Sequence, residues 1–458
     1  MNARVVFSRR LCAALFCWGM ALTASAREWL IPSPDNGNEA AVTALTNALA
    51  NCAEKDVVTL AKGVYDLAGV IGSTDDANGD SHLVVEKRNV TLRGDPSATR
   101  DEVVLLGGGA RILRLNGHHC WIGNLTMTNG CAQKGSGGAI VVTDGAAMGA
   151  ACYLTNCVFR GNTSNGTGGA GVVAGVTMSG CLAESNVASA GSAGALKYGH
   201  AFDTVFRNNR GVEGGACTQV VLVDCLLEGN VAQSGRGGAV SYSCRATNCV
   251  FRYNAANGPG GALENGRDLL NCSFIGNRGA ANGGALVDQR GTVSNCWFES
   301  NWVKEGGSQG AIHANAAAAV LVQDSVFTNN AAGWSGGVGS GVSVWSNCVF
   351  VGNAIRATVG KAAGTVGGTY YGCTFRDQWS TTDANRRDPT NDIPRVTRWM
   401  GALSVNGGML FDCTVEGCVT NCVLTRCTFT GSTNLPLVVA ANCALTNCLV
   451  VGNRLARD

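Results

Sequence analysis

Residues 247–254 read Thr-Asn-Cys-Val-Phe-Arg-Tyr-Asn, and the same pattern returns at 270–277 and at 294–301. The second copy is Leu-Asn-Cys-Ser-Phe-Ile-Gly-Asn and the third is Ser-Asn-Cys-Trp-Phe-Glu-Ser-Asn. The copies begin 23 and 24 residues apart. A period of this size indicates stacked supersecondary units that bury a common core.

The asparagine that closes each copy extends the pattern along the chain. It recurs at steps of 21 to 33 residues, at Asn129, Asn162, Asn186, Asn209, Asn230, Asn254, Asn277, Asn301, Asn330 and Asn353. Because no helix-forming stretch lies between the asparagines, so short a period leaves room only for short strands and turns. We therefore predict an all-β fold, a single-stranded right-handed parallel β-helix, in which each repeat forms one coil.

The place of each residue type in the repeat predicts which side chains are buried. Cys249 and Phe251 are two residues apart, so on a strand they share a face, while Val250 between them faces the other way. We expect the cysteine and phenylalanine face to form the core. The asparagine or aspartate before each cysteine suits a left-handed bend, and the Gly-Gly that begins residues 260–263 provides a second bend.

Stacking of the coils places equivalent residues above one another. Asparagine amides in such a column can bond the copies above and below. We expect this structural ladder at Asn162, Asn186, Asn209, Asn230, Asn254, Asn277, Asn301, Asn330 and Asn353.

Three segments are expected along the chain. Residues 1–26 contain arginines, an apolar run and a small-x-small ending, which predicts a signal peptide and export. Residues 27–110 are expected to hold the N-terminal cap and the first coils, with a short helix at 38–52 closing the open end of the core. Residues 111–458 are expected to hold the other coils, with a long loop at 376–399. We expect no transmembrane segment in the mature chain, because no later stretch has the roughly 18 apolar residues of a span.

Two paired motifs resemble the repeats of chlamydial polymorphic outer-membrane proteins. One is Phe-x-x-Asn, as in residues 274–277, and the other is Gly-Gly-Ala followed by an aliphatic residue, as in residues 283–286. Residues 90–129 are similar to the first coils of right-handed β-helix proteins of the pectate-lyase-like group. The resemblance covers about residues 30–453 and implies a surface-exposed adhesin. The family's C-terminal membrane barrel has no counterpart after Asn453, so transport by such a barrel is not expected.

Charge and cysteine usage narrow the chemistry. Charged residues are 14% of the chain and the formal net charge is +2, so nucleic acid is not an expected partner. Eight of the 22 cysteines recur at one repeat position, which favours buried, reduced thiols over the alternative of disulfides: Cys157, Cys181, Cys225, Cys249, Cys272, Cys296, Cys348 and Cys373. Cys413, Cys418, Cys422 and Cys427 raise the alternative of zinc, although their spacing is not that of a zinc finger. We predict no metal and no cofactor.

An enzyme is the alternative function, because polysaccharide lyases and hydrolases share this fold. A glycosidase needs converging carboxylates, and a calcium-assisted lyase needs several carboxylates and a base. The acids of the repeats are isolated along the sequence: Asp144, Asp203, Glu213, Asp224 and Glu264. Asp75, Asp76 and Asp80 favour a solvated turn over a calcium site, and the five histidines do not recur in a spaced set. We therefore predict no catalytic residues.

Three tryptophans are the candidate ligand-binding residues: Trp297, Trp302 and Trp334. Trp297 faces away from the core, on a coil next to that of Trp334, and exposed aromatic rings stack on sugars or anchor proteins, unless a loop covers them. The sequence thus predicts a secreted or surface-exposed, non-catalytic, adhesin-like protein, extracellular or at the outer cell surface. Its partner would be a polysaccharide or a cell-surface protein bound to the lateral face. Several carboxylates or basic side chains gathered in a lateral groove would instead favour the lyase or hydrolase.

Overall fold

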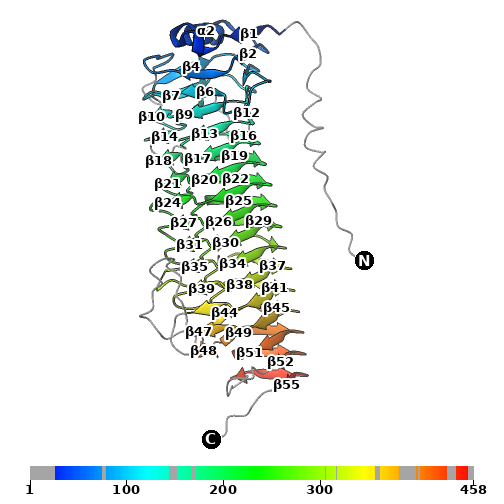
Figure 1. The fold of residues 1–458 in the computed structure, drawn as a ribbon. Coiled ribbons are helices and arrows are strands. Elements are labelled where there is room, and N and C mark those ends of the chain that lie inside the picture. The colour runs from blue at the N-terminus through cyan, green and yellow to red at the C-terminus, as the bar shows by residue number, and fades with distance from the viewer. Residues whose placement is uncertain are drawn as a thin grey trace.

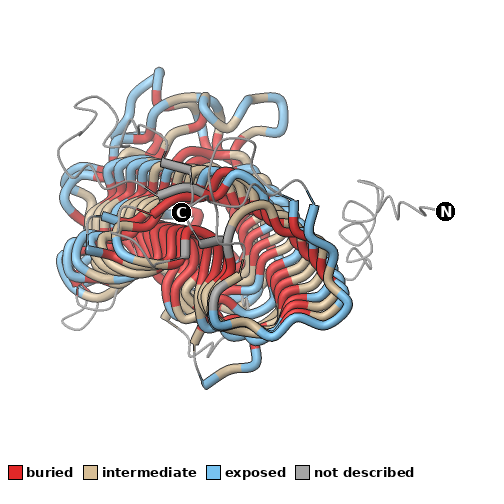
Figure 2. Tube along the Cα trace, turned by 90° about the horizontal axis from the view of Figure 1, so that it is seen from below, coloured by how far each residue is buried: buried red, intermediate tan, exposed pale blue. Residues whose placement is uncertain are grey.

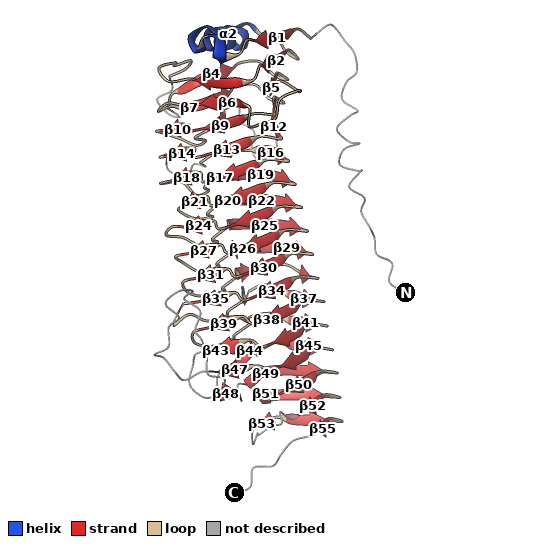
Figure 3. Cartoon of the chain, in the orientation of Figure 1, coloured by secondary structure: helices blue, strands red, loops and turns tan. Residues whose placement is uncertain are grey.

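The chain forms a right-handed parallel β-helix, as predicted, with its coils stacked into one rod (Figure 1). The structure is a computed structural model. It describes residues 26–74, 79–143, 152–166, 171–304, 306–315, 317–355, 362–380, 399–400, 403–430 and 440–451. Almost all regular structure in these residues is strand (Figure 3).

Three long sheets form the walls of the rod. The 24-stranded sheet includes β19 (Leu196–Phe202), β22 (Cys217–Val223), β25 (Val240–Thr247), β28 (Leu263–Glu264), β29 (Gly266–Leu270), β32 (Leu286–Gln289) and β36 (Ile312–Ala314). The 16-stranded sheet includes β3 (Gly63–Asp66), β26 (Val250–Arg252), β30 (Ser273–Ile275), β34 (Trp297–Glu299) and β55 (Leu449–Val451). The 12-stranded sheet includes β10 (Cys131–Ala132), β27 (Ala255–Ala256), β35 (Trp302–Val303), β39 (Ala331–Ala332), β47 (Trp379–Ser380) and β48 (Trp399–Met400).

A single coil shows how the repeat makes its corners. Asn248 follows strand β25, and its φ of 56° turns the chain into β26; Tyr253, also at φ 56°, turns it into β27. The Gly-Gly bend at residues 260–261 then leads into β28 of the next coil. Side-chain amides also link the first corners of neighbouring coils, as from Asn271 to Asn248 at 3.1 Å.

The N-terminal end of the rod is closed by helix α2 (Asn38–Asn51), close to the predicted 38–52. Its buried side chains are Ala41, Val42, Leu45, Ala48 and Leu49, which join the core of the first coils. No helix in the described part of the chain is long and apolar enough to cross a membrane. Residues 1–25 of the expected signal peptide and 381–398 of the expected loop lie outside the described residues.

Buried residues line the inside of the stacked coils (Figure 2), and many of them are aromatic residues and cysteines. Phe251, Phe274 and Phe298 are fully buried, and their rings stack nearly parallel with centroids 4.8 and 4.7 Å apart. Every cysteine among the described residues is free. Burial raises the pKa of the Cys217 and Cys244 thiols well above the ordinary value, so both stay protonated and pack as small apolar groups.

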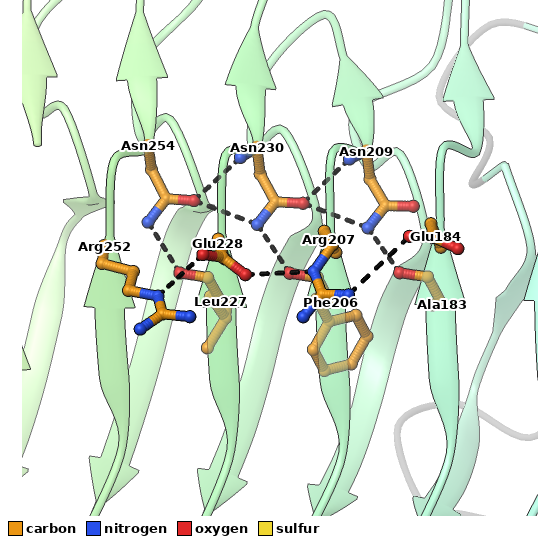
Figure 4. Close-up of polar contacts among 10 residues, drawn as sticks. All are labelled: Ala183, Glu184, Phe206, Arg207, Asn209, Leu227, Glu228, Asn230, Arg252 and Asn254. Atoms are coloured by element: carbon orange, nitrogen blue, oxygen red, sulfur yellow. Dashed lines mark hydrogen bonds and ion pairs between the residues drawn. The ribbon is translucent and has the colours of Figure 1, made fainter.

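Hydrogen bonds between asparagines run along the buried corner of the rod (Figure 4). The Nδ2 of Asn230 donates to the Phe206 carbonyl and to Oδ1 of Asn254, both at 3.0 Å, and the backbone N–H of Asn230 donates to the same Oδ1. The same three bonds recur on each coil from Asn162 to Asn330. Because these residues are fully buried, water cannot replace a lost partner.

Asn129, the first asparagine of the recurring series, lies outside the buried ladder, which was predicted from Asn162 onward. In the strand register Gly130 stands beside Asn162, and its backbone N–H donates to Asn162 Oδ1 at 2.9 Å. Asn129 instead occupies the exposed left-handed bend one residue earlier, with φ 59°. Beyond Asn353, Gln378 takes the ladder position and donates to a strand carbonyl at 2.9 Å, a longer side chain that a search for asparagines misses.

Replacement of Asn277 by alanine is expected to lower the free energy of unfolding by about 1–3 kcal/mol, because it leaves buried partners unsatisfied. The lost bonds join Asn277 to Asn254, to Asn301 and to the Phe251 carbonyl. Denaturant unfolding measures the change. The matched control is Asn257→Ala at an exposed loop position, and equal losses for the two variants would contradict a special role for the ladder.

The buried thiols are expected to resist alkylation in the folded protein and to react fully in guanidinium chloride, because only a thiolate attacks the reagent. Mass spectrometry after iodoacetamide treatment gives the number of modified residues in each state. Thiols that stay unmodified in denaturant without a reductant would indicate disulfides instead.

Candidate functional site

A cleft opens on the lateral face of the rod beside β19, β22 and β25. Its volume is about 450 Å³, within the usual range for ligand sites. The lining residues are Ala190, Gly191, Ser192, Lys197, Tyr198, Val212, Glu213, Thr218, Gln219 and Tyr242. Two aromatic rings, a carboxylate and an ammonium group therefore share one cavity.

A column of left-handed residues runs through this face. Tyr198, Gln219 and Tyr242 lie side by side on successive coils, with φ values of 53°, 53° and 62°. The column continues at Asn265 and Asp288, with φ 59° and 52°. Positive φ is uncommon for residues other than glycine, so five such residues in neighbouring coils set this face apart.

Neighbouring charges orient the two tyrosines of the cleft. The Tyr242 hydroxyl donates a hydrogen bond to the Glu213 carboxylate, and this bond together with burial raises the pKa of Tyr242 to about 12. The phenol therefore stays protonated at any physiological pH. The ammonium nitrogen of Lys197 lies 4.8 Å from the centroid of the Tyr198 ring, a cation–π contact.

Arg236 joins two carboxylates on the coils that follow. Its Nη1 lies 2.7 Å from Oδ2 of Asp288 and 3.6 Å from Oε1 of Glu264. Since both contacts involve one nitrogen, the two carboxylate oxygens are no farther apart than these two distances combined. Oδ1 of Asp288 lies 3.9 Å from Nδ1 of His313. The His313 side chain is half-buried, but this nitrogen atom is itself buried and has no hydrogen-bond partner among the described residues.

The two carboxylates lie in different environments. Glu264 has a side chain only 13% exposed, and burial, aided by the nearby negative charges of Glu213 and Asp288, raises its pKa above the usual value. Burial lowers the pKa of His313 although Asp288 opposes the shift. The lowered pKa leaves His313 neutral at neutral pH. Glu264 keeps its proton to a higher pH than an ordinary glutamate does, and it stands next to an Asp288 that is paired with arginine.

The three predicted tryptophans lie on other parts of the surface. Trp297 is 42% exposed on the 16-stranded sheet and donates its indole N–H to Glu299 at 3.1 Å. Trp302 is half-buried on the 12-stranded sheet, 5.5 Å from the guanidinium carbon of Arg278. Trp334 is 55% exposed in the loop after β39. The cleft lining includes none of these three residues.

Glu213 and Glu264, expected to be isolated acids, belong to one constellation with Arg236 and Asp288. Glu213 and Arg236 each stand immediately before a Gly-Gly pair, so the repeat itself places them on the same side of the rod. Their equivalent positions in the repeat could have predicted from the sequence that these two residues lie close together. No such signal predicted the left-handed conformation of Tyr198 and Tyr242, because most left-handed corners of the described residues carry glycine, asparagine or aspartate.

The other cysteines and acids that the sequence analysis considered for metal binding or catalysis do not form a common site among the described residues. Cys413 and Cys427 belong to one buried column, whereas Cys422 neighbours Cys443; the Cys418 side chain lies outside the described residues. No group of His, Cys, Asp or Glu in the described ranges has the geometry of a metal site. Asp203 and Asp224 occupy left-handed bends, and Asp75, Asp76 and Asp144 fall outside the described residues.

No protein-family model matches the sequence, and no curated protein matches it. Solved structures of parallel β-helix proteins match the fold. A mannuronic acid-specific family 6 polysaccharide lyase from the human gut microbiota is 13% identical, with a TM-score of 0.34 over 88% of this chain and 86% of that one. A PL6 family alginate lyase is 13% identical, with a TM-score of 0.39 over 92% and 76%.

Tailspike protein 3 of bacteriophage CBA120 is 12% identical, with a TM-score of 0.35 over 91% of this chain and 60% of that one. At these identities and TM-scores the likeness carries no information about activity. The class of this protein is therefore that of the right-handed parallel β-helix, and its chemistry has to be argued from its own side chains.

Glu264→Gln is expected to stabilise the protein near neutral pH. A raised pKa in the folded state gives stability that is fully present below the unfolded pKa and is lost as pH rises through the folded pKa. The amide removes that loss, so its advantage should vanish below about pH 4, near the unfolded pKa. Thermal unfolding across pH measures this. The exposed Asp268→Asn is the control, and the same gain in both variants would contradict the assignment.

Proposed function

We propose that this chain is an exported glycan-binding β-helix protein that hydrolyses an uncharged polysaccharide in its lateral cleft. The observation that carries the proposal is the pair Glu264 and Asp288, held by one guanidinium nitrogen of Arg236. Glycosidases use two carboxyl groups about 5 to 9.5 Å apart, one protonated and one ionised. The shared contact keeps this pair close enough for such a mechanism.

The different surroundings of Glu264 and Asp288 suit them to different roles in hydrolysis. Burial raises the pKa of Glu264, which suits a general acid that protonates the leaving glycosidic oxygen. Arg236 contacts Asp288 at 2.7 Å and fixes its position, which suits the group that stabilises positive charge at the anomeric carbon. His313, neutral and next to Asp288, orients that carboxylate without adding charge.

The charge of the cleft favours an uncharged substrate. Glu213 and Lys197 line the cleft, and on the coils that follow Glu264 and Asp288 both contact Arg236. Three carboxylates therefore stand against two cationic side chains, and the contacts of Arg236 with two of those carboxylates occupy it. A lyase acting on uronates needs a cation for the substrate's carboxylate, whereas a hydrolase of neutral sugars does not. Hydrolysis is therefore the better match to these residues.

Between the two functions considered for this sequence, the charged cleft supports the enzyme over an adhesin-like protein that only binds. The resemblance to chlamydial polymorphic outer-membrane proteins and the predicted signal peptide support a place outside the cell, where a polysaccharide is available. Trp297, Trp302 and Trp334 remain candidates for additional contacts with a glycan or a cell-surface protein, away from the cleft.

The test is a panel of laminarin, xylan, galactomannan and polygalacturonate, assayed for new reducing ends and for retention in affinity gels. We expect turnover on a neutral polymer and none on polygalacturonate. Glu264→Gln should lower kcat by about 100-fold or more, the usual share of a general acid, and keep the retention.

Asp268→Asn, an acid-to-amide change at an exposed residue, should keep full activity. Retention without turnover on any polymer would support the adhesin-like function instead. Full activity in Glu264→Gln would show that the chemistry lies elsewhere.

A further inference from the structure

One bend of the coil carries its bulkiest residues inside the cleft. The bend follows the first residues of each coil in the 24-stranded sheet, and strand register places its members in one column. Before the cleft the residue is Gly175; after the cleft come Asn265 and Asp288, and farther along the rod Gly341, Gly367 and Gly407, all with positive φ. Glycine adopts this conformation without steric cost, so it is what the bend by itself requires.

Inside the cleft the same bend carries Tyr198, Gln219 and Tyr242. A β-carbon in the left-handed conformation meets the backbone, and bulky residues are the least suited to it. Burial of apolar surface does not explain the choice of Tyr242, because 42% of that residue remains exposed. Strained residues of this kind persist where their side chains serve a site.

The geometry of these residues suits sugar rings. Tyr198 and Tyr242 lie two coils apart, roughly 10 Å along the rod, and Gln219 stands between them. Each tyrosine offers an apolar ring and a polar tip, which match the apolar face and the hydroxyl edge of a sugar. The contacts with Lys197 and Glu213 hold both rings in place before a ligand arrives.

We propose that Tyr198, Gln219 and Tyr242 form sugar-binding subsites and that the glycan lies along the rod axis, with its scissile bond at Glu264. The location of the scissile bond rests on the proposed function, whereas binding to the subsites does not. From β19 to β28 the coils advance three spacings, about 14 Å, so the site takes several sugars of a polymer on the N-terminal side of Glu264. Short oligosaccharides fill only the part nearest Glu264.

Tyr242→Gly tests the subsites, because glycine relieves the strain while it removes the ring. In the Glu264→Gln background, calorimetry with oligosaccharides of rising length from the best-retained neutral polymer should show about tenfold weaker binding of the long ones, the equivalent of one stacked ring. Binding of the shortest should not change. The thermal midpoint of the variant should be equal to or above that of its parent, and Tyr242→Phe should keep most of the affinity.

The matched control is Tyr253→Gly, which makes the same change at φ 56° on an exposed corner after β26, away from the cleft. It should leave glycan affinity unchanged. Equal affinities for Tyr242→Gly and its parent, equal losses in the two glycine variants, or a lower thermal midpoint for Tyr242→Gly would each overturn the proposal.

The results separate the two proposals. Retention that depends on Tyr242 without any turnover by the wild-type protein leaves the subsites standing and removes the hydrolase. Turnover that does not depend on Tyr242 leaves the hydrolase standing and removes the subsites. A wild-type protein that retains none of the polymers overturns both.

Discussion

Backbone hydrogen bonds between successive coils are the constraint on which the rest of this structure depends. Each strand bonds to the coil before it and the coil after it, so equivalent residues lie about 4.8 Å apart. Only residues that tolerate a copy of themselves at that distance can fill the interior. Phenylalanine does so by parallel stacking, as between Phe274 and Phe298 at 4.7 Å. Asparagine does so because its amide carries both donors and an acceptor, and neutral thiols do so because they repel neither each other nor the apolar core.

Like charges repel one another at the spacing of successive coils. The outer surface shows two arrangements of charged residues that reduce this repulsion. Along one edge of the 16-stranded sheet the charges alternate in the order Arg160, Glu184, Arg207, Glu228 and Arg252, with contacts of 2.8 to 3.9 Å (Figure 4). Each acid there has an arginine on either side, and exposed pairs of this kind add little stability. On the coils after the cleft one arginine contacts two carboxylates, Glu264 and Asp288, and burial together with the nearby negative charges raises the pKa of Glu264.

The Gly-Gly corner links the fold to the cleft. A β-carbon on Gly238 or Gly261 would lie 2.0 or 2.1 Å from the next coil's carbonyl oxygen, so only glycine fits there. The residue just before this corner is free to vary, and Glu213 and Arg236 occupy that position on adjacent coils. The Gly-Gly corner, where only glycine fits, therefore fixes the positions of Glu213 and Arg236 beside the cleft.

The sequence by itself determined the β-helix, the capping helix near 38–52 and the inward face of Cys249 and Phe251, because each follows from local periodicity and backbone preference. It did not show that Gln378 continues the asparagine ladder, since a search by residue type passes over a longer amide. The cleft was decided by the tertiary structure alone. Glu213, Arg236, Glu264 and Asp288 are separated by 23 to 28 residues and meet only when coils stack in register. The pKa of Glu264 and the strain at Tyr242 arise from neighbours that the stacking supplies, so no local pattern in the chain records them.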